Sequence, residues 1–372
     1  MEETRKLASI QKVSFLKPIE GADKIECAGV LGWEVVVGKG TFKEGDLCVY
    51  FEIDSLVPQD NPAFAFLAAK KWKVKTVRLR GQISQGLALP VSAFPVLSDC
   101  RISEGDDVTA VLGVVKYEKD DEDCDTEEKE PGWIRALSKW RFFRVNIKPI
   151  ICPYRSKSFP IGIIAKSDET RIQNLSGALQ NFQGKRFIMT EKLEGTSATY
   201  VLRRIGMFKR FDVFSRKTWR SGVGNVYGKM AKANNIREFL ERVMKGSYAE
   251  SVALQGEIVG PKIQGNIYGL QKVKIFVYRI KVNFKDGRHF FLSPSEIAAS
   301  LCSSGSVMSP VPVIGEFRFC PETTVKDVLD LADGKSQIGD VLREGIVFVC
   351  DEDPEISFKA VSNKYLLEKD GK

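Results

Sequence analysis

A single acidic run constrains the fold of this chain more than any other feature. From Tyr117 to Gly132 the sequence holds nine acidic residues, two basic residues and almost no apolar ones. A segment of that composition cannot bury enough apolar surface to form a core. We therefore expect residues 117–132 to be a linker between two folded parts, 1–116 and 133–372. At 372 residues the chain is long enough for a separate hydrophobic core in each.

The net charge differs between these parts. Residues 1–116 hold 15 basic and 15 acidic residues, whereas residues 133–372 hold 39 basic and 24 acidic, a net charge of +15. So basic a segment is typical of a protein that binds a polyanion. A basic surface that only keeps the protein in solution would give the same count.

The composition excludes several classes of mechanism. There is one histidine, His289, so histidine triads, histidine-ligated zinc and phosphohistidine chemistry would all depend on it. The eight cysteines form no Cys-x-x-Cys pair, which indicates reduced thiols and not a disulfide framework or zinc site. No apolar run approaches the roughly 18 residues of a membrane span. Because Met1 to Glu3 is acidic and no apolar h-region follows, we expect no signal peptide. We expect a cytoplasmic or nuclear monomer without membrane contact.

A lysine at the end of an apolar strand is the strongest candidate for chemistry. Residues 187–189 lead into Glu191-Lys192-Leu193-Glu194-Gly195, where the glycine closes a tight turn. A lysine held at a strand end, with an acidic neighbour and room for a phosphate, is suited to act as a nucleophilic amine. The pattern Lys-x-Glu-Gly alone is weak, because it occurs by chance in many proteins.

The first part of the chain is expected to be all-β. Apolar and polar residues alternate over Ala8 to Leu16, and glycines and turn residues separate further short strands near 25–31, 33–37, 47–51, 75–80 and 85–89. Short strands at this spacing predict a small closed barrel of OB type.

Three segments of this part resemble the OB domains that bind structured RNA: Gly21 to Ile25, Glu44 to Asp46, and Arg78 to Gly86. The resemblance implies oligonucleotide binding across one strand face and its loops. Trp72 lies among the candidate contact residues, but it could equally be a core residue beside a solvated basic edge. These candidates are Lys70, Lys71, Lys73, Lys75, Arg78 and Arg80.

The second part is expected to be α+β, with antiparallel sheets and helices. Helical patterns occur near 133–143, over 166–174 with Ser167 as N-cap, over 225–245, and after Ser293, where a capping box is present. Arg171 and Asn174 would share one helical face.

Further segments repeat a known order of motifs. Together with Lys192 they resemble the covalent nucleotidyltransferase superfamily of polynucleotide ligases and mRNA capping enzymes. The matching segments are Lys192 to Gly195, Ser215-Arg216, Glu257, Phe276 to Ile280, Glu344 to Val347, and Lys359. Only 13 residues follow Lys359, and the OB-type part comes first, as in the RNA-ligase branch with an N-terminal OB module. Three residues depart from the pattern: Glu194 replaces a common Asp, Arg279 a common acid, and Ser197 an Asn that holds a 5′-phosphate in a sister branch.

The resemblance implies an ATP-dependent RNA ligase that joins 3′-OH and 5′-phosphate ends in nick sealing and RNA repair. Lys192 would form a lysyl-AMP, which requires its pKa to fall well below about 10.4. The implied partners are ATP, Mg²⁺ or Mn²⁺, and RNA, as a nicked duplex or an RNA/DNA hybrid. Two alternatives stay open: a DNA or mixed-strand nick ligase, and a catalytically inactive RNA-binding protein.

The resemblance also implies a role for each motif residue. The cation would be held by Glu194, Glu257 and Glu344 through its waters. Nucleic acid would contact Arg171 and Ser197. The nucleotide would contact Glu191, Arg216, Phe276, Lys359 and Lys364.

Overall fold

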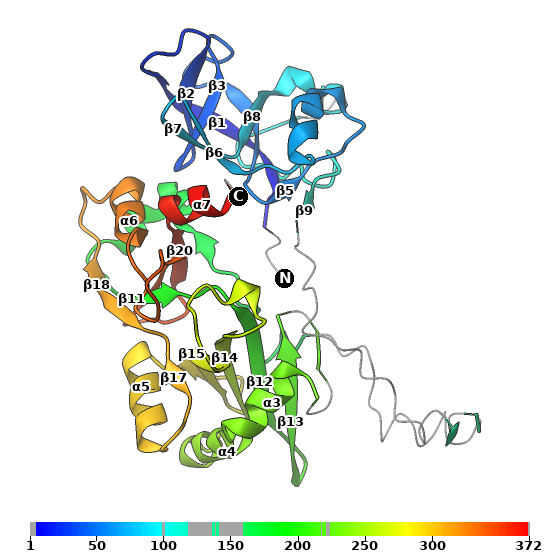
Figure 1. Ribbon diagram of the computed structural model, residues 1–372, viewed down its shortest axis with the longest axis vertical. Helices are drawn as coiled ribbons and strands as arrows, with labels where there is room; N and C mark the ends of the chain where they lie inside the picture. The colour runs from blue at the N-terminus through cyan, green and yellow to red at the C-terminus, as the bar shows by residue number, and fades with distance from the viewer. Residues whose placement is uncertain are drawn as a thin grey trace.

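The computed structural model describes residues 5–98, 101–117, 136–137, 139–140, 159–216, 218–220 and 224–370. Three sheets follow one another along the long axis of the molecule (Figure 1). The N-terminal sheet forms one end, and the other two sheets, with their helices, form the rest. The fold is therefore α+β, as expected. The acidic run after Tyr117 and most of the expected helix at 133–143 lie outside the described residues.

The N-terminal part is built on a five-stranded antiparallel sheet with the order β3-β2-β1-β4-β8. Its core includes the buried rings of Trp33, Tyr50 and Phe51. The segment expected as two strands forms three, because Arg80 and Gly81 have positive φ and turn the chain back. Two further pairs, β5-β9 and β6-β7, complete this part. The bounds are β1 Ala8–Pro18, β2 Ile25–Val30, β3 Trp33–Gly38, β4 Leu47–Phe51, β5 Ser55–Leu56, β6 Thr76–Leu79, β7 Gln82–Gln85, β8 Leu87–Pro90 and β9 Val115–Lys116.

The middle sheet has the order β10-β20-β19-β11-β18. Stacked and edge-on rings, among them Phe182, Phe187, Phe348 and Phe358, fill its core. The helix α6 and a 3-10 helix, Ile172–Phe182, pack on this core. The bounds are β10 Thr170–Arg171, β11 Arg186–Lys192, β18 Val313–Arg318, β19 Gly345–Cys350, β20 Ser357–Val361 and α6 Val325–Ala332.

The third sheet has the order β13-β12-β14-β15-β16, and β17 pairs with β15. Side chains of α3, α4 and α5 form one large core with it. The expected helix at 225–245 is two helices, because Asn235 has a positive φ between them. The capping box at Ser293 is confirmed. The bounds are β12 Thr196–Ile205, β13 Phe208–Ser215, β14 Ser251–Val259, β15 Lys274–Asn283, β16 His289–Phe291, β17 Ser309–Pro310, α3 Val226–Ala233, α4 Ile236–Ser247 and α5 Pro294–Ser303.

The expected helix at 166–174 is wrong. The chain forms the short strand β10, which runs parallel to β20, and then the 3-10 helix. Ser167 does not cap a helix, because its hydroxyl lies 3.0 Å from that of Ser197.

The N-terminal part packs closely on the middle sheet. The indole nitrogen of Trp33 donates to Asn174 at 2.7 Å, and the backbone nitrogen of Gly32 donates to the carbonyl of Gln173 at 2.9 Å. A side chain at position 32 would bring its Cβ to 2.8 Å from that carbonyl oxygen, so only glycine fits without displacement. The helix α7, Asn363–Asp370, lies between the two parts (Figure 1). No helix in the described part of the chain has the length and apolar character needed to cross a lipid bilayer.

Candidate active site

A cavity of about 420 Å³ lies where the three sheets meet. Its volume is within the range of small-molecule sites. All three parts of the molecule contribute charged side chains, so the pocket depends on how the N-terminal part is docked. The charged residues that line it are Arg5, Asp54, Lys73, Lys116, Asp168, Glu169, Arg171, Glu191, Lys192, Glu194, Arg216, Glu257, Arg279, Glu344, Lys359 and Lys369.

Lys192 is the last residue of β11, and its ammonium group lies 2.6 Å from a carboxylate oxygen of Glu344. The two residues meet because β11 and β19 are antiparallel, with Lys192 opposite Gly345. Burial alone would lower the pKa of Lys192, but the adjacent Glu344 carboxylate, together with Glu257 and Glu169, outweighs burial and raises the pKa above the ordinary value. The lowered pKa expected from the sequence is therefore not found: Lys192 is held as a cation.

The glycines of the two motifs allow strands to approach closely. A Cβ at Gly195 would lie 2.4 Å from the carbonyl oxygen of Ile258, beside Glu257. A Cβ at Gly345 would lie 2.2 Å from the carbonyl oxygen of Ala360. Neither glycine has a positive φ. Both are needed because they bring lysine and carboxylates from separate strands into one pocket, not because of a turn conformation.

The three carboxylates predicted to hold a cation all line the pocket. Burial raises the pKa of Glu257 to about 8, although nearby Lys192 opposes this. Glu194 accepts from the ammonium group of Lys369 at 2.6 Å and from the hydroxyl of Tyr365. Among the described residues no three acidic, histidine or cysteine side chains are close enough to bind a metal directly. Three carboxylates that line one pocket without forming a direct ligand set fit a hard cation that keeps most of its waters.

A second cluster gathers cations around one carboxylate. Asp168 lies 2.8 Å from Lys359, 3.0 Å from Arg216 and 3.0 Å from Lys116 of the N-terminal part. Burial would raise the pKa of Asp168, but these three cations hold it far below its usual range. Burial lowers the pKa of Lys359 to about 8, even with Asp168 beside it. Three cations on one acid leave an excess of positive charge for an anionic ligand.

Arg171 extends this basic side of the pocket. Its side chain is buried, and its Nη2 lies 3.4 Å from Asp54, which Lys73 also approaches at 3.4 Å. The Nε and Nη1 atoms of Arg171 have no hydrogen-bond partner among the described residues. Buried guanidinium donors are rarely left unpaired, so this side of the pocket is suited to phosphate oxygens.

Two further predicted residues line the pocket with defined partners. The carboxylate of Glu191 is buried, and its Oε2 accepts from the backbone nitrogen of Gln337 at 2.8 Å. Its Oε1 has no partner among the described residues and can accept from a ligand. The hydroxyl of Ser197 lies 2.8 Å from that of Tyr278.

Comparisons with known proteins agree with this geometry. A family model of RNA ligases matches residues 185–365, and a model of an OB-fold domain matches residues 7–91. Solved structures of a Naegleria gruberi RNA ligase, one with PPi and one a mutant with AMP and Mn, are 33% identical to this chain with a TM-score of 0.80. Alignments cover 98% of this chain and 98–99% of theirs. The chain belongs to the RNA ligase family. A comparison with curated proteins gives no match.

Some predicted residues of this RNA ligase lie outside the pocket. Phe276 does not line the cavity, because its ring packs in a core with Leu193 and Tyr268. The expected stacking of Phe276 on adenine therefore has no support in the geometry. Lys364 is exposed and pairs with Asp333 at 3.5 Å.

The predicted basic row of the N-terminal part is also divided. Lys73 lines the pocket, and Trp72 packs against the hydrophobic core of this part, as its alternative interpretation allowed. The rest of the row lies outside the cavity: Lys70, Lys71, Lys75, Arg78 and Arg80.

Several residues that line the ligase pocket were not predicted from the sequence. Asp168 and Glu169 stand in the segment expected as a helix, for which the sequence predicted no catalytic role. Glu169 pairs with Arg279 at 3.1 Å, so an acid from another element accompanies the arginine that departs from the family pattern. Arg5, Asp54 and Lys116 belong to the N-terminal part, whose sequence carries no recognised catalytic motif. These three residues can be assigned to the pocket only from the contacts that the folded chain makes between distant segments.

Proposed function

We propose that this ligase uses ATP to join 3′-OH and 5′-phosphate RNA ends, in nick sealing and RNA repair. The observation that carries the proposal is the ion pair of Lys192 and Glu344 inside a cavity that also holds a separate group of cations. The nucleophile and a phosphate-binding region are thereby within one nucleotide-sized site. We also propose that residues 1–116 are an OB-fold domain that binds nucleic acid, residues 117–132 a linker, and residues 133–372 the nucleotidyltransferase domain.

In the first step Lys192 Nζ attacks the α-phosphorus of ATP. A nitrogen–phosphorus bond forms, and the bond to pyrophosphate breaks with its electron pair leaving on oxygen. Lys192 must first lose a proton, and Glu344, at 2.6 Å, is the nearest acceptor. Lys359, Arg216 and Arg171 would bind the phosphates, exchanging part of their contact with Asp168 and Asp54 for phosphate oxygens.

The donors in the pocket fit Mg²⁺ or Mn²⁺, because all three candidate ligands are carboxylates. Glu194, Glu257 and Glu344 would hold the cation through its waters. When bound, it supplies positive charge beside the phosphate oxygens. The Naegleria relatives were solved with ATP and Mn, which supports the same requirement here.

The two later steps use the same residues. A 5′-phosphate oxygen attacks the AMP phosphorus, and the nitrogen–phosphorus bond to Lys192 breaks. A 3′-hydroxyl then attacks the 5′-phosphate and AMP leaves. The unpaired Oε1 of Glu191 would accept from the amino group of adenine. Ser197 and Arg171 would lie near the end that receives AMP.

Transfer of label from α-labelled ATP tests the proposal at its first step. The wild-type ligase should become labelled, lose the label to pyrophosphate, and pass AMP to a 5′-phosphorylated strand. Matched nicked substrates of RNA, DNA and hybrid composition then test strand choice. Sealing of DNA nicks in preference to RNA would favour the mixed-strand alternative. A protein that binds RNA without taking label would be the inactive binding protein.

A further inference from the structure

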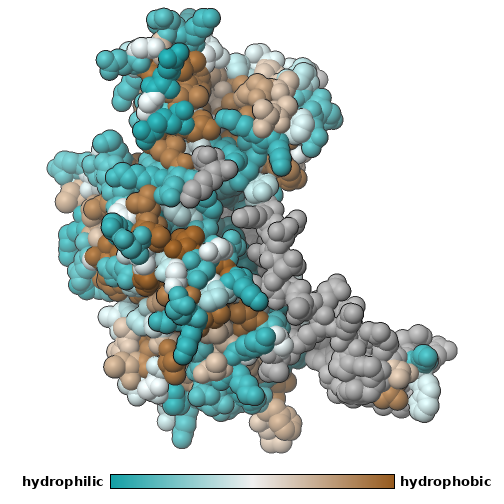
Figure 2. Space-filling model, in the orientation of Figure 1, coloured by the Kyte–Doolittle hydropathy of each residue, from teal (hydrophilic) through white to brown (hydrophobic). Residues whose placement is uncertain are grey.

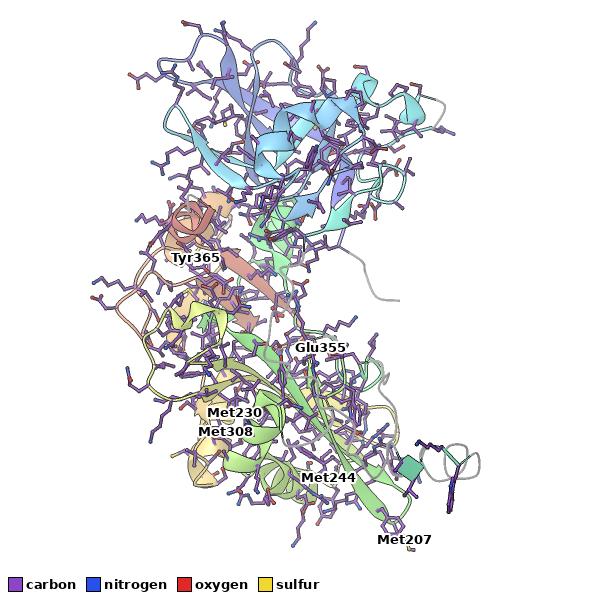
Figure 3. The ribbon with its side chains drawn as sticks, turned by 45° about the vertical axis from the view of Figure 1, so that its right-hand side comes forward. Met207, Met230, Met244, Met308, Glu355 and Tyr365 are labelled. Carbon is purple, nitrogen blue, oxygen red and sulfur yellow. The ribbon has the colours of Figure 1, made fainter. Side chains whose placement is uncertain are left out.

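The hairpin that joins β12 to β13 carries an exposed apolar tip between cations. Its sequence, Arg203 to Arg210, holds four basic residues and no acidic one. At the tip Met207 is 94% exposed and Phe208 is 77% exposed. Figure 3 shows Met207 at the end of the hairpin. Figure 2 shows this end of the molecule as a tan projection beyond the polar surface. Large apolar side chains exposed together in this way mark an interaction surface.

Part of this hairpin faces the same side of the sheet as the active site. Strand β12 pairs with β14 from Thr196 to Arg203 and with β13 from Ala198 to Ile205, in both cases without a register shift. Because alternate residues of a strand share a face, Arg203 and Ile205 lie on the face of Ser197. Arg210 stands opposite Arg203, and Phe208 stands opposite Ile205. We call Arg203, Ile205, Phe208 and Arg210 the hairpin patch.

The two arginines of the hairpin patch are fixed in positions from which they can bind an anion. Both donate to the buried carboxylate of Asp212, Arg203 at 3.3 Å and Arg210 at 3.0 Å. Two cations on one acid leave one positive charge in excess. The Nε of Arg203 is buried and has no acceptor among the described residues. Guanidinium groups fixed by a shared acid lose little freedom when they bind a phosphate.

The hairpin patch is separate from the pocket. Phe159 and Ile164 pack on Val201 and Phe214 between the two. Eight residues of extended strand separate Ser197 from Ile205, a distance of roughly 26 Å. This is the length of roughly eight base pairs of B-form DNA at about 3.4 Å each, and of roughly nine base pairs of A-form RNA, whose rise is shorter.

We propose that the hairpin patch contacts the RNA that flanks the break, about nine base pairs from the joined ends. This inference rests on the proposed function, because RNA is the partner it assigns. Arginines contact the phosphates, and Phe208, with Met207 beside it, packs against a base or sugar. Cations interleaved with an exposed aromatic ring are typical of nucleic-acid surfaces. The common face with the pocket favours the substrate itself over an unrelated protein partner.

Binding of nicked RNA duplexes to the full-length protein tests the proposal. The tip variant combines Met207→Ser with Phe208→Ala, and its control is Val307→Ser, an equally exposed residue after α5. Duplexes with arms of about 6 and about 16 base pairs are compared, since only the longer arms reach the patch. We expect the tip variant to weaken binding of the long duplex about tenfold and to leave the short duplex and self-adenylation unchanged.

A second variant tests the arginines. Arg203→Gln, Arg210→Gln and Asp212→Asn are combined, so that no buried acid is left unpaired. Lys326→Gln on α6 changes the net charge by the same amount and is the control. The triple variant should reduce the salt dependence of long-duplex binding by about one to two phosphate contacts. If the triple variant fails to fold, as judged by lost self-adenylation, the tip variant alone tests whether the hairpin patch contacts RNA.

The outcomes separate this proposal from the proposed function. Equal loss on short and long duplexes, or no loss on either, would overturn the hairpin patch as an RNA contact. If the tip variant bound RNA as well as the wild-type protein does, the exposed tip would instead be assigned to a protein partner. Failure of the wild-type protein to join any RNA would instead overturn the proposed function and, with it, the assigned partner.

Discussion

Lys192 is held as an ammonium ion by the same carboxylate that we expect to accept its proton. Glu344 is 2.6 Å away, and it raises the pKa of Lys192 against the effect of burial. The reaction needs the neutral amine. Whatever neutralises or withdraws the charge of Glu344 therefore lowers the pKa of Lys192 and activates it.

Substitution of Lys192 tests its role as nucleophile. Lys192→Ala should take no label from α-labelled ATP, and Lys192→Arg should fail as well because arginine stays protonated. Circular dichroism should show an intact fold. The control is Lys326→Ala, an exposed lysine on α6. Label retained on Lys192→Ala would mean that another residue is the nucleophile.

The pH dependence of ATP binding follows from two neighbouring groups. The pKa of Lys359 is about 8, so its positive charge is present below this pH and lost above it. The pKa of Glu257 is also about 8, so a negative charge appears over the same range. Both changes oppose a polyanion. In the non-reacting Lys192→Arg variant, which keeps the charge that helps to set both pKa values, and without metal, Kd should rise with pH above 8, by up to about tenfold per pH unit for each group.

Two substitutions separate these contributions. Lys359→Arg keeps its charge and should leave only the weaker effect of Glu257. Lys359→Arg combined with Glu257→Gln should make Kd nearly independent of pH between about 7 and 9. Titration calorimetry measures both. A Kd that stays constant in Lys192→Arg over this range would contradict the assignment of Lys359 to the phosphates.

At the scale of elements, helix α7 positions a predicted metal-binding carboxylate. Tyr365 and Lys369 both donate to Glu194, and the backbone nitrogen of Glu194 donates to Tyr268. Figure 3 shows Tyr365 on the helix beneath the N-terminal part. At its other end α7 bonds to that part, since Gln85 donates to Asn363 at 3.0 Å.

Two lysines of α7 make a matched comparison. Lys369→Ala removes a charged partner of Glu194 and should slow self-adenylation about tenfold, since hydrogen bonds to charged groups contribute about 1.5–3 kcal/mol. Lys364→Ala lies on the same helix but outside the pocket, and it should retain most activity. A larger loss from Lys364→Ala would restore the role in nucleotide binding that the family resemblance assigned to it.

The sequence predicts the strand-borne part of the site well, because motif spacing reflects local structure. Lys192, Glu257 and Glu344 each stand on or beside a strand with a recognisable apolar pattern, and all three line the pocket. The spacing of motifs could not decide whether Phe276 faces a ligand or a core. An aromatic residue in a strand has the same pattern whether it faces a ligand or a core. Asp168 was missed because only contact with three distant cations distinguishes it.

At the scale of the whole molecule, the N-terminal part is a component of the pocket. Arg5, Asp54, Lys73 and Lys116 line the cavity, and Lys116 pairs with Asp168. The sequence could not predict this contact, because the N-terminal part has no net charge and so gave no sign of a phosphate site. The docking depends on a close approach of Gly32 to Gln173.

Substitution of Gly32 tests how far catalysis depends on docking. Gly32→Ala places a Cβ 2.8 Å from backbone of the middle part, so the two parts must separate, while both folds stay intact. Self-adenylation should fall about tenfold. Gly177→Ala is the control, because its Cβ meets nothing within 4 Å in the adjacent 3-10 helix. Full activity of Gly32→Ala would show that the N-terminal part is dispensable for this step.

A pocket built from two docked parts makes its ligand a cross-link between them. By thermodynamic reciprocity, if docking raises the affinity for ATP by some factor, ATP raises the stability of the docked arrangement by the same factor. The 2.7 Å bond from Trp33 to Asn174, two residues that do not line the pocket, then becomes a reporter of occupancy. Amide hydrogens at this junction should exchange more slowly with solvent as nucleotide is added, and release of AMP should reverse the change.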